Sequence, residues 1–141
     1  MKTFNLNNNE NIPVIGFGVF MIPNNGPTYE ATLAALKAGY RHIDTAAGYM
    51  NESDVGKAIK DSGVPREEIF ITSKLWLQDY GYENAKKGID TFIKSHWVAD
   101  YMELYLLHQP YIGRLFGFMA GFRRSSSPRK DKINWYFKCY S

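Results

Sequence analysis

The heptapeptide IFITSKL at residues 69–75 decides the fold class of this chain. Its β-branched and aromatic residues favour a strand. Similar runs occur at residues 40–44 (YRHID) and 101–107 (YMELYLL), and the latter is apolar enough to be buried on both faces. Neighbouring runs are separated by about the length of one helix with its loops. Repetition of this unit predicts a parallel sheet with right-handed helical crossovers.

Helical patterns fill the gaps between the predicted strands. Apolar residues recur at helical spacing over residues 28–38, 52–62 and 82–95. Thr28 and Asn51 stand where a side chain can cap the first and second of these helices. Strands and helices therefore alternate over most of the first 110 residues.

The N-terminal residues predict a hairpin and a short strand. Apolar segments at residues 2–6 and 11–15 flank a polar, Asn-rich turn, and residues 15–20 form a short apolar run with two glycines. The predicted fold is α/β: an N-terminal β-hairpin, then four parallel strands and three helices. A closed (β/α)8 barrel needs roughly 250 residues and this chain has 141, so we expect a partial (β/α)8 TIM barrel of about four βα units.

The charge distribution divides the chain near residue 110. Residues 1–110 carry 10 Lys and Arg against 13 Asp and Glu, whereas residues 111–141 carry 7 against 1. Periodicity also ends there, and the sequence SSSP at residues 125–128 is typical of a linker. We expect one α/β domain over residues 1–110 and a basic, aromatic tail over residues 111–141.

Composition argues against export and membrane insertion. No apolar run approaches the about 18 to 20 residues of a membrane span, and the first residues lead into no apolar signal segment. The single cysteine, Cys139, fits a reducing cytosol, so a cytoplasmic location is expected. No metal-ligand pattern links Cys139 to His42 and His96, and no metal site is expected. The basic tail could bind RNA or an anionic membrane surface, but no binding fold is evident, so we expect neither partner.

Polar side chains follow three of the predicted strands at their C-terminal ends. Asp44, Lys74 and His108 are 30 and 34 residues apart, about the length of one βα unit. Because the carboxyl ends of parallel strands meet at one rim, we expect these side chains to lie side by side, with Tyr49 in the loop above. An acid, a phenol, an amine and an imidazole at one point can hold and polarise a carbonyl oxygen.

Reduction of a carbonyl needs a group that stabilises the charge growing on oxygen and delivers a proton. Tyr49 can donate that proton, and the ammonium of Lys74 favours the ionised phenol. Asp44 would keep Lys74 charged and oriented, and His108 would give the substrate oxygen a second hydrogen bond. The walls of a small pocket for a carbonyl substrate are expected from Phe20 and Trp76.

Several motifs occur in the order and at the spacing of a known family: GFGVF at 16–20, GYRHIDTA at 39–46, ITSKLW at 71–76 and DYMELYLLH at 100–108, with Tyr49, Asn51-Glu52 and Val55-Gly56 between them. They make residues 3 to about 110 resemble the N-terminal half of an aldo-keto reductase of the bacterial type. The resemblance implies a (β/α)8 barrel that reduces aldehydes and ketones with NADPH. It makes Tyr49 the proton donor, assisted by Asp44, Lys74 and His108. It places Gly18, Val19, Phe20 and Asp44 near the nicotinamide end of the cofactor.

Two segments depart from the family pattern. Residues 94–99 replace a short turn before the fourth strand, and nothing after Pro110 resembles the family. The abrupt change in charge and periodicity of this tail is what translation in a shifted reading frame would produce. The leading interpretation is an NADPH-dependent reductase. The alternative is a non-catalytic truncated remnant or an assembly module that pairs through its half-barrel edge. Open edges on the first and fourth strands predict self-association.

Overall fold

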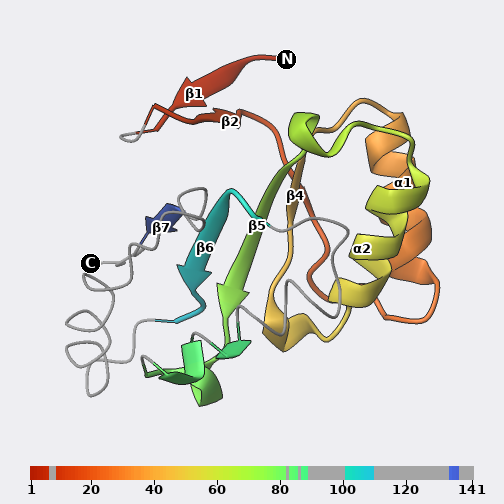
Figure 1. Cartoon of the computed structure of the whole chain (residues 1–141). Helices are drawn as coiled ribbons and strands as arrows, with labels where there is room; N and C mark the ends of the chain where they lie inside the picture. The colour runs from red at the N-terminus through yellow and green to blue at the C-terminus, as the bar shows by residue number, and fades with distance from the viewer. Residues whose placement is uncertain (7–8, 82, 86, 89–100, 110–133, 137–141) are drawn as a thin grey trace.

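A computed structural model describes residues 1–6, 9–81, 83–85, 87–88, 101–109 and 134–136. The described part consists of a hairpin, a parallel sheet and two α-helices, with short 3₁₀-helices between them (Figure 1). The hairpin lies across the N-terminal end of the sheet, and the helices lie together on one side of it. The C-terminal ends of the strands therefore face the opposite end of the molecule from the hairpin.

The N-terminal hairpin forms where the Asn-rich turn predicts it. β1 (Thr3–Asn5) pairs antiparallel with β2 (Asn11–Pro13). Asn9, in the turn between them, has a φ of 68°, a left-handed conformation that asparagine adopts more readily than most residues. The predicted hairpin is confirmed, with shorter strands than the apolar runs suggest.

The sheet has five parallel strands in the order β3-β4-β5-β6-β7. They are β3 (Phe17–Gly18), β4 (His42–Asp44), β5 (Phe70–Leu75), β6 (Leu104–Leu107) and β7 (Asn134–Tyr136). The first four lie within the predicted strands, so the parallel α/β fold is confirmed. The sheet is not closed into a barrel, and β3 and β7 are its edges in the described part of the chain.

The predicted open edge on the fourth strand is wrong. β7 belongs to residues 111–141, for which the sequence predicts no strand, and it pairs along β6 from Leu104 to Leu106. This pairing satisfies backbone groups that β6 would otherwise expose. A strand of three residues is too short for an alternating pattern to be visible. In the described residues the sheet therefore has five strands where the sequence predicts four.

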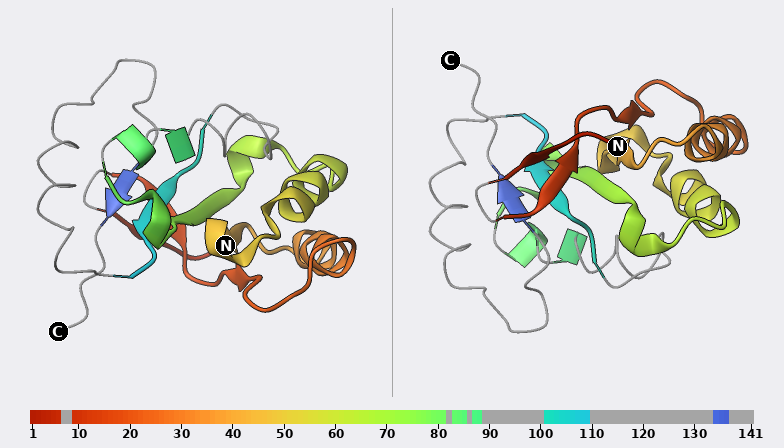
Figure 2. Two further views of the ribbon diagram at one scale, coloured as in Figure 1. Left: turned by 90° about the horizontal axis from the view of Figure 1, so that it is seen from below. Right: turned by 90° about the horizontal axis from the view of Figure 1, so that it is seen from above.

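Two of the three predicted helices are described in full. α1 (Pro27–Lys37) and α2 (Glu52–Asp61) match the first two predicted helices and pack against each other, side by side in both views of Figure 2. Within the third, predicted over residues 82–95, residues 83–85 and 87–88 are helical. The other residues of that prediction lie outside the described part of the chain.

Both predicted caps bind other partners. α1 begins after Gly26, and the Thr28 hydroxyl lies within hydrogen-bond distance of the carbonyl oxygens of Ile22 and Pro23, at 3.0 and 2.9 Å. Asn51 does occupy the N-cap position of α2, but its side chain makes no capping hydrogen bond. The prediction of two side-chain caps is wrong because the same short polar side chains also serve tertiary contacts with loop carbonyls.

The hydrophobic core lies between the sheet and the two helices. Ile71 and Leu75 on β5 are each 1% exposed, whereas Thr72 and Lys74 line a cavity on the opposite face of the sheet. Further large members of the core are Val19, Leu36, Ile43, Val55, Ile59, Met102 and Tyr105. This alternation directs the side chains of Thr72 and Lys74 away from the helices and toward one cavity.

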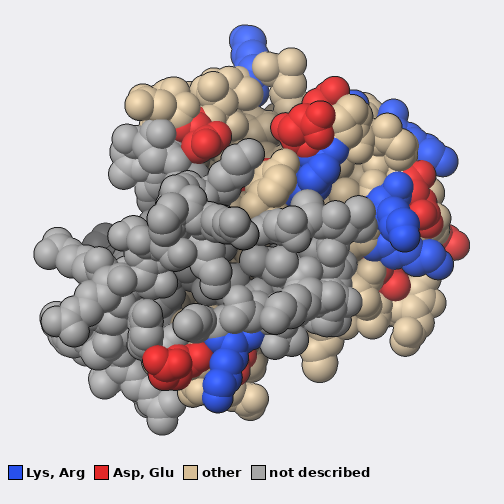
Figure 3. Space-filling view, in the orientation of Figure 1, with Lys and Arg blue, Asp and Glu red and all other residues tan. Residues whose placement is uncertain are grey.

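The visible surface carries charges of both signs. On the face shown in Figure 3, Lys and Arg side chains alternate with Asp and Glu side chains over the described residues of the helical side. None of the helices in the described ranges is long and apolar enough to cross a membrane.

Candidate active site

The four predicted catalytic residues come together at the C-terminal end of the sheet. Asp44 is the last residue of β4, Lys74 the last but one of β5, and His108 follows β6 directly. Tyr49 ends η1 (Ala47–Tyr49), a 3₁₀-helix that follows β4. Because β4, β5 and β6 are neighbouring parallel strands, residues at their ends lie at one rim of the sheet.

The ammonium group of Lys74 is the centre of this cluster. Its Nζ forms an ion pair with Asp44 Oδ1 and donates hydrogen bonds to the Thr45 carbonyl oxygen at 2.9 Å and the Tyr49 phenol oxygen at 3.4 Å. The Lys74 side chain is only 15% exposed, so its charge is partly desolvated and is balanced by the Asp44 carboxylate. The arrangement holds a cation beside the phenol oxygen, where it would stabilise a phenolate.

His108 adds a half-buried ring whose two nitrogens are buried. The ring lies edge-on to Tyr49, with centroids 5.7 Å apart and planes at 88°. Neither Nδ1 nor Nε2 has a hydrogen-bond partner among the described residues. Burial, followed by the charge of Lys74, lowers the pKa of His108, which favours the neutral ring. A neutral ring keeps one N–H donor, and a bound carbonyl oxygen would satisfy it.

Two more aromatic rings extend the cluster. Phe20 packs on Tyr49 with ring centroids 5.0 Å apart, and Trp76 lies edge-on to His108 at 4.9 Å. Gly48 makes room for Trp76, because a Cβ at that position would lie 2.3 Å from the indole Cε3. The structure therefore brings the residues predicted as pocket walls into contact with two of the predicted catalytic rings.

The residues predicted to contact the cofactor differ in accessibility. Gly18 pairs with Asp44 across β3 and β4, and a Cβ built on Gly18 would meet nothing within 4 Å. Phe20 is 64% exposed. Val19 is fully buried in the core, and its N–H donates to the Asp44 carbonyl oxygen at 3.1 Å. Gly18, Phe20 and Asp44 can thus meet a ligand at this rim, and the Val19 side chain cannot.

A cavity of about 460 Å³ opens beside Lys74. It is lined by Asp44, Lys74 and His108 of the cluster, together with Gly16, Gly18, His42, Thr72, Leu104, Leu106 and Leu107. Tyr49, Phe20 and Trp76 are outside this lining. Three of the four predicted catalytic side chains therefore border one hollow of small-molecule size. In the ranges that the structure describes, no group of three or more His, Cys, Asp or Glu could hold a metal ion.

Sequence reasoning missed a second polar layer beneath the cluster. His42 Nε2 lies 2.9 Å from Thr72 Oγ1, and both residues line the cavity. Burial lowers the pKa of His42. His42 and Thr72 precede Asp44 and Lys74 by two positions on their strands. Because strand residues two apart share a face, this spacing could have revealed them.

A buried carboxyl group lies on the helix-facing side of β5. Glu52, the first residue of α2, is 7% exposed, and its Oε1 accepts a hydrogen bond from Ser73 Oγ at 2.7 Å. Burial raises the pKa of Glu52 to about 7, although Ser73 and the charge of Lys74 act in the opposite direction. Sequence reasoning missed this group because an acidic residue in the first turn of a helix is ordinarily solvated.

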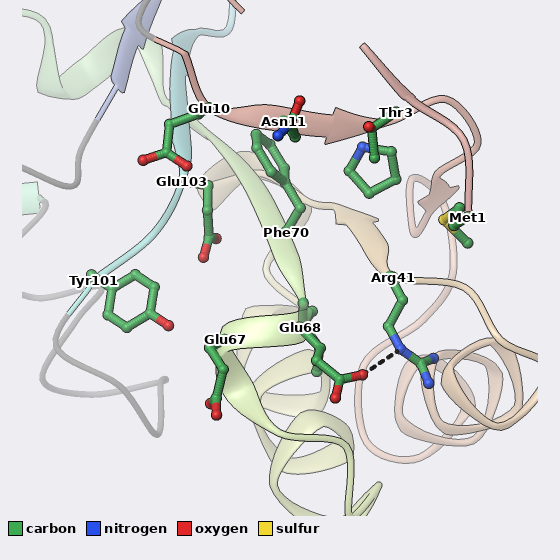
Figure 4. A pocket seen from close by; sticks show the side chains of 12 residues that line it. Met1, Thr3, Glu10, Asn11, Arg41, Glu67, Glu68, Phe70, Tyr101 and Glu103 are labelled. Carbon is green, nitrogen blue, oxygen red and sulfur yellow. Dashed lines mark ion pairs between the residues drawn. The ribbon is translucent and has the colours of Figure 1, made fainter. Parts of the chain in front are cut away.

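A second cavity, of about 440 Å³, lies at the other end of the strands, beneath the hairpin (Figure 4). Ion pairs hold the side chains around it: Arg41 pairs with Glu68 at 3.5 Å, and Arg66 donates to both oxygens of Glu103 at 2.9 and 3.0 Å. In β/α barrels the N-terminal face serves stability and the C-terminal face carries catalysis. The candidate active site is therefore the cluster around Lys74.

Comparison with known proteins assigns this fold and cluster to a family. Residues 7–112 match the model of the aldo/keto reductase family. The chain is 52% identical to aldehyde reductase YPR1 of Saccharomyces cerevisiae over 77% of this chain and 33% of that protein. It is 44% identical to the glycerol 2-dehydrogenase (NADP(+)) of the same yeast over 96% of this chain and 44% of that protein. The chain belongs to the aldo/keto reductase family.

Solved structures support the same assignment. An aldo/keto reductase from Brucella melitensis is 41% identical, with a TM-score of 0.83 over 98% of this chain and 54% of that chain. An aldo-keto reductase from a deep-sea metagenome library is 40% identical, with a TM-score of 0.84 over 96% of this chain and 49% of that chain. The chain thus spans between a third and about half of the length of these relatives. The predicted family and the partial-barrel fold are confirmed.

Proposed function

We propose that this chain supplies catalytic residues for the NADPH-dependent reduction of an aldehyde or ketone to an alcohol, with Tyr49 as the proton donor. The observation that carries the proposal is the Lys74 ammonium, which contacts Asp44 and lies 3.4 Å from the Tyr49 phenol oxygen. The unpartnered nitrogens of His108 add a hydrogen-bond donor beside it. The relatives named aldehyde reductase and glyoxal reductase support a carbonyl substrate.

Each residue of the cluster has a distinct part in this reaction. NADPH, when bound, supplies the hydride that adds to the carbonyl carbon. Negative charge then grows on the carbonyl oxygen, and the Tyr49 hydroxyl transfers its proton to that oxygen, which leaves an alcohol and a phenolate. The Lys74 ammonium stabilises the phenolate, and Asp44 keeps the ammonium in place. His108 donates a hydrogen bond that orients the substrate oxygen, and solvent returns the proton to Tyr49.

The described residues fit a nicotinamide ring at this rim. Gly18 leaves open space for a planar ring to approach the backbone, and Phe20 offers an exposed aromatic face. The relative named glycerol 2-dehydrogenase (NADP(+)) supports the choice of cofactor. Because the chain spans 33% to 54% of the length of the relatives quoted above, the proposal is limited to this end of the cofactor. We also propose a cytosolic location, because a single cysteine fits a reducing compartment.

NADPH is expected to quench the fluorescence of Trp76 at micromolar concentration. Trp76 lies against His108, with ring centroids 4.9 Å apart, so a ring bound beside His108 changes its surroundings. Replacing Trp97 and Trp135 by Phe isolates the signal of Trp76 in the titration. A fluorescence unchanged at millimolar NADPH contradicts the proposal and favours a non-catalytic chain.

The exposed apolar surface favours self-association, which we propose as a property of the chain with or without NADPH. In the described part of the chain, the large exposed hydrophobic side chains come from the hairpin, the flanks of β3 and the residue after η1: Met1, Phe4, Val14, Ile15, Phe20, Met21 and Met50. β3 is also an edge strand, and apolar edges invite pairing with another chain. We expect concentration-dependent dimers or larger species in sedimentation velocity. A sharp monomer at all concentrations contradicts this expectation.

A further inference from the structure

A strained turn after β3 presents Phe20 to the candidate site. The N–H of Ile22 donates to the carbonyl oxygen of Val19 at 3.2 Å, which closes a turn over residues 19–22. Met21 in this turn has a φ of 61°, a left-handed conformation that few residues with a side chain adopt. Strain of this kind persists only where the surrounding structure enforces it. The contact between Phe20 and Tyr49 therefore depends on what holds the turn.

Asn51 holds both ends of this turn. Its side chain is fully buried, and Nδ2 donates to the carbonyl oxygen of Val19 at 3.0 Å and to that of Ile22 at 2.9 Å. The same amide lies 3.2 Å from Thr28 Oγ1, and its Oδ1 accepts from Thr45 Oγ1 at 3.4 Å. Thr28 in turn donates to the Ile22 carbonyl oxygen. One amide thus connects α1, α2 and the residue after β4 to the turn that carries Phe20.

The use of Asn51 at this turn has a local cost. Asn51 stands at the N-cap position of α2 and makes no capping hydrogen bond, although such a bond ordinarily stabilises a helix. Asp54, one turn further along α2, holds the same loop at a different point, since its Oδ2 accepts from the N–H of Gly26 at 2.8 Å. The attachments of the loop to this helix thus include one beside Phe20 and a separate one at the start of α1.

We propose that Asn51 is a positioning residue for the substrate wall, because it holds the turn over residues 19–22 and thereby fixes the Phe20 ring against Tyr49. The kinetic consequence rests on the proposed carbonyl reduction. When the turn relaxes, the Phe20 ring leaves Tyr49 and the wall opens, whereas Lys74 and the Tyr49 hydroxyl stay in place. Binding of the carbonyl substrate then weakens more than proton transfer slows.

The test compares Asn51→Ala with Asp54→Ala, which removes the acceptor for the Gly26 N–H and so loosens the same loop away from Phe20. The first readout is the nuclear Overhauser effect between the Phe20 and Tyr49 rings, whose centroids lie 5.0 Å apart. We expect this signal to disappear in Asn51→Ala and to persist in Asp54→Ala. The second readout is kinetic: the KM for a small aldehyde should rise about tenfold in Asn51→Ala, with kcat changed less than about twofold. Asp54→Ala should leave both constants near those of the unmodified chain.

The ring signal decides the proposal without reference to turnover. Its persistence in Asn51→Ala overturns the proposal, and so does its loss in both variants, because any loosening of the loop would then suffice. Asn51→Ser serves as the second variant if Asn51→Ala does not fold, since it keeps one hydroxyl but cannot donate to two carbonyls at once. The ring signal can behave as expected even if neither the parent chain nor any variant reduces the aldehyde. In that case the proposed function fails, and the positioning of Phe20 by Asn51 stands.

Discussion

Replacing Tyr49 by phenylalanine should abolish carbonyl reduction and leave the fold unchanged. The substitution removes the hydroxyl that lies 3.4 Å from Lys74 Nζ. It keeps the ring that packs on Phe20 and His108 at 5.0 and 5.7 Å. Loss of a positioned proton donor typically lowers a rate by about 10²- to 10⁴-fold. The measurement is NADPH oxidation in the presence of a small aldehyde, with a circular dichroism melting curve for the fold.

Tyr29→Phe is the matched control for this substitution. The Tyr29 hydroxyl is exposed and donates to Asp61 Oδ2 at 3.1 Å, on the helical side of the molecule. Its removal should leave the rate unchanged. A Tyr49→Phe chain that retains more than about a tenth of the parent rate contradicts the role of Tyr49, because a proton donor contributes far more than that.

Between about pH 5 and pH 8 the buried Glu52 carboxyl should lower the free energy of unfolding as the pH rises, and Glu52→Gln should remove this contribution. Burial raises the pKa of Glu52 from 4.5 to about 7 in the folded protein. Between these two values Glu52 is more protonated in the folded state than in the unfolded state, so its contribution to stability decreases with rising pH, by about 3 kcal/mol. Glutamine can still accept the hydrogen bond from Ser73 but carries no charge to bury.

Urea unfolding at the two pH values measures this effect. Glu67→Gln is the control, because Glu67 is exposed and should keep the full pH dependence of the parent. The raised pKa of Glu103 adds a slope of the same sign, and the lowered pKa values of His42 and His108 add a slope of the opposite sign, but both are common to all three proteins. The informative quantity is therefore the difference between the proteins in how their free energy of unfolding changes with pH. Parallel losses of stability in the parent and in Glu52→Gln would show that Glu52 does not titrate as a buried group.

The place of the candidate site could be predicted because it depends on local patterns. Each strand was visible as an apolar run, and the polar residue at its end marked the rim of a parallel sheet. The contacts of Lys74 with Asp44 and Tyr49 agree with the prediction that these side chains lie together at the rim. Contacts between rings, such as Phe20 on Tyr49, follow from the same placement because both residues stand in loops above the strands.

The remaining features depend on partners that a local pattern does not contain. Asn51 resembles an ordinary helix cap, and only the folded chain shows its amide bound to the carbonyls of Val19 and Ile22. Glu52 resembles a solvated first-turn acid until Ser73 is found against it. β7 is three residues long, and its pairing with β6 bridges a wide separation along the chain. Burial and long-range pairing, rather than propensity, decide these three cases.

A crystal structure of the chain would measure the separation between Lys74 Nζ and the Tyr49 phenol oxygen, on which the proposed chemistry depends. We predict that the two atoms lie within hydrogen-bond range, at 3.4 Å in the present structure, with Asp44 on the same ammonium and His108 beside the phenol. A structure in which the ammonium and the phenol oxygen are more than about 6 Å apart would contradict the proposed chemistry, because the cation could then no longer stabilise the phenolate.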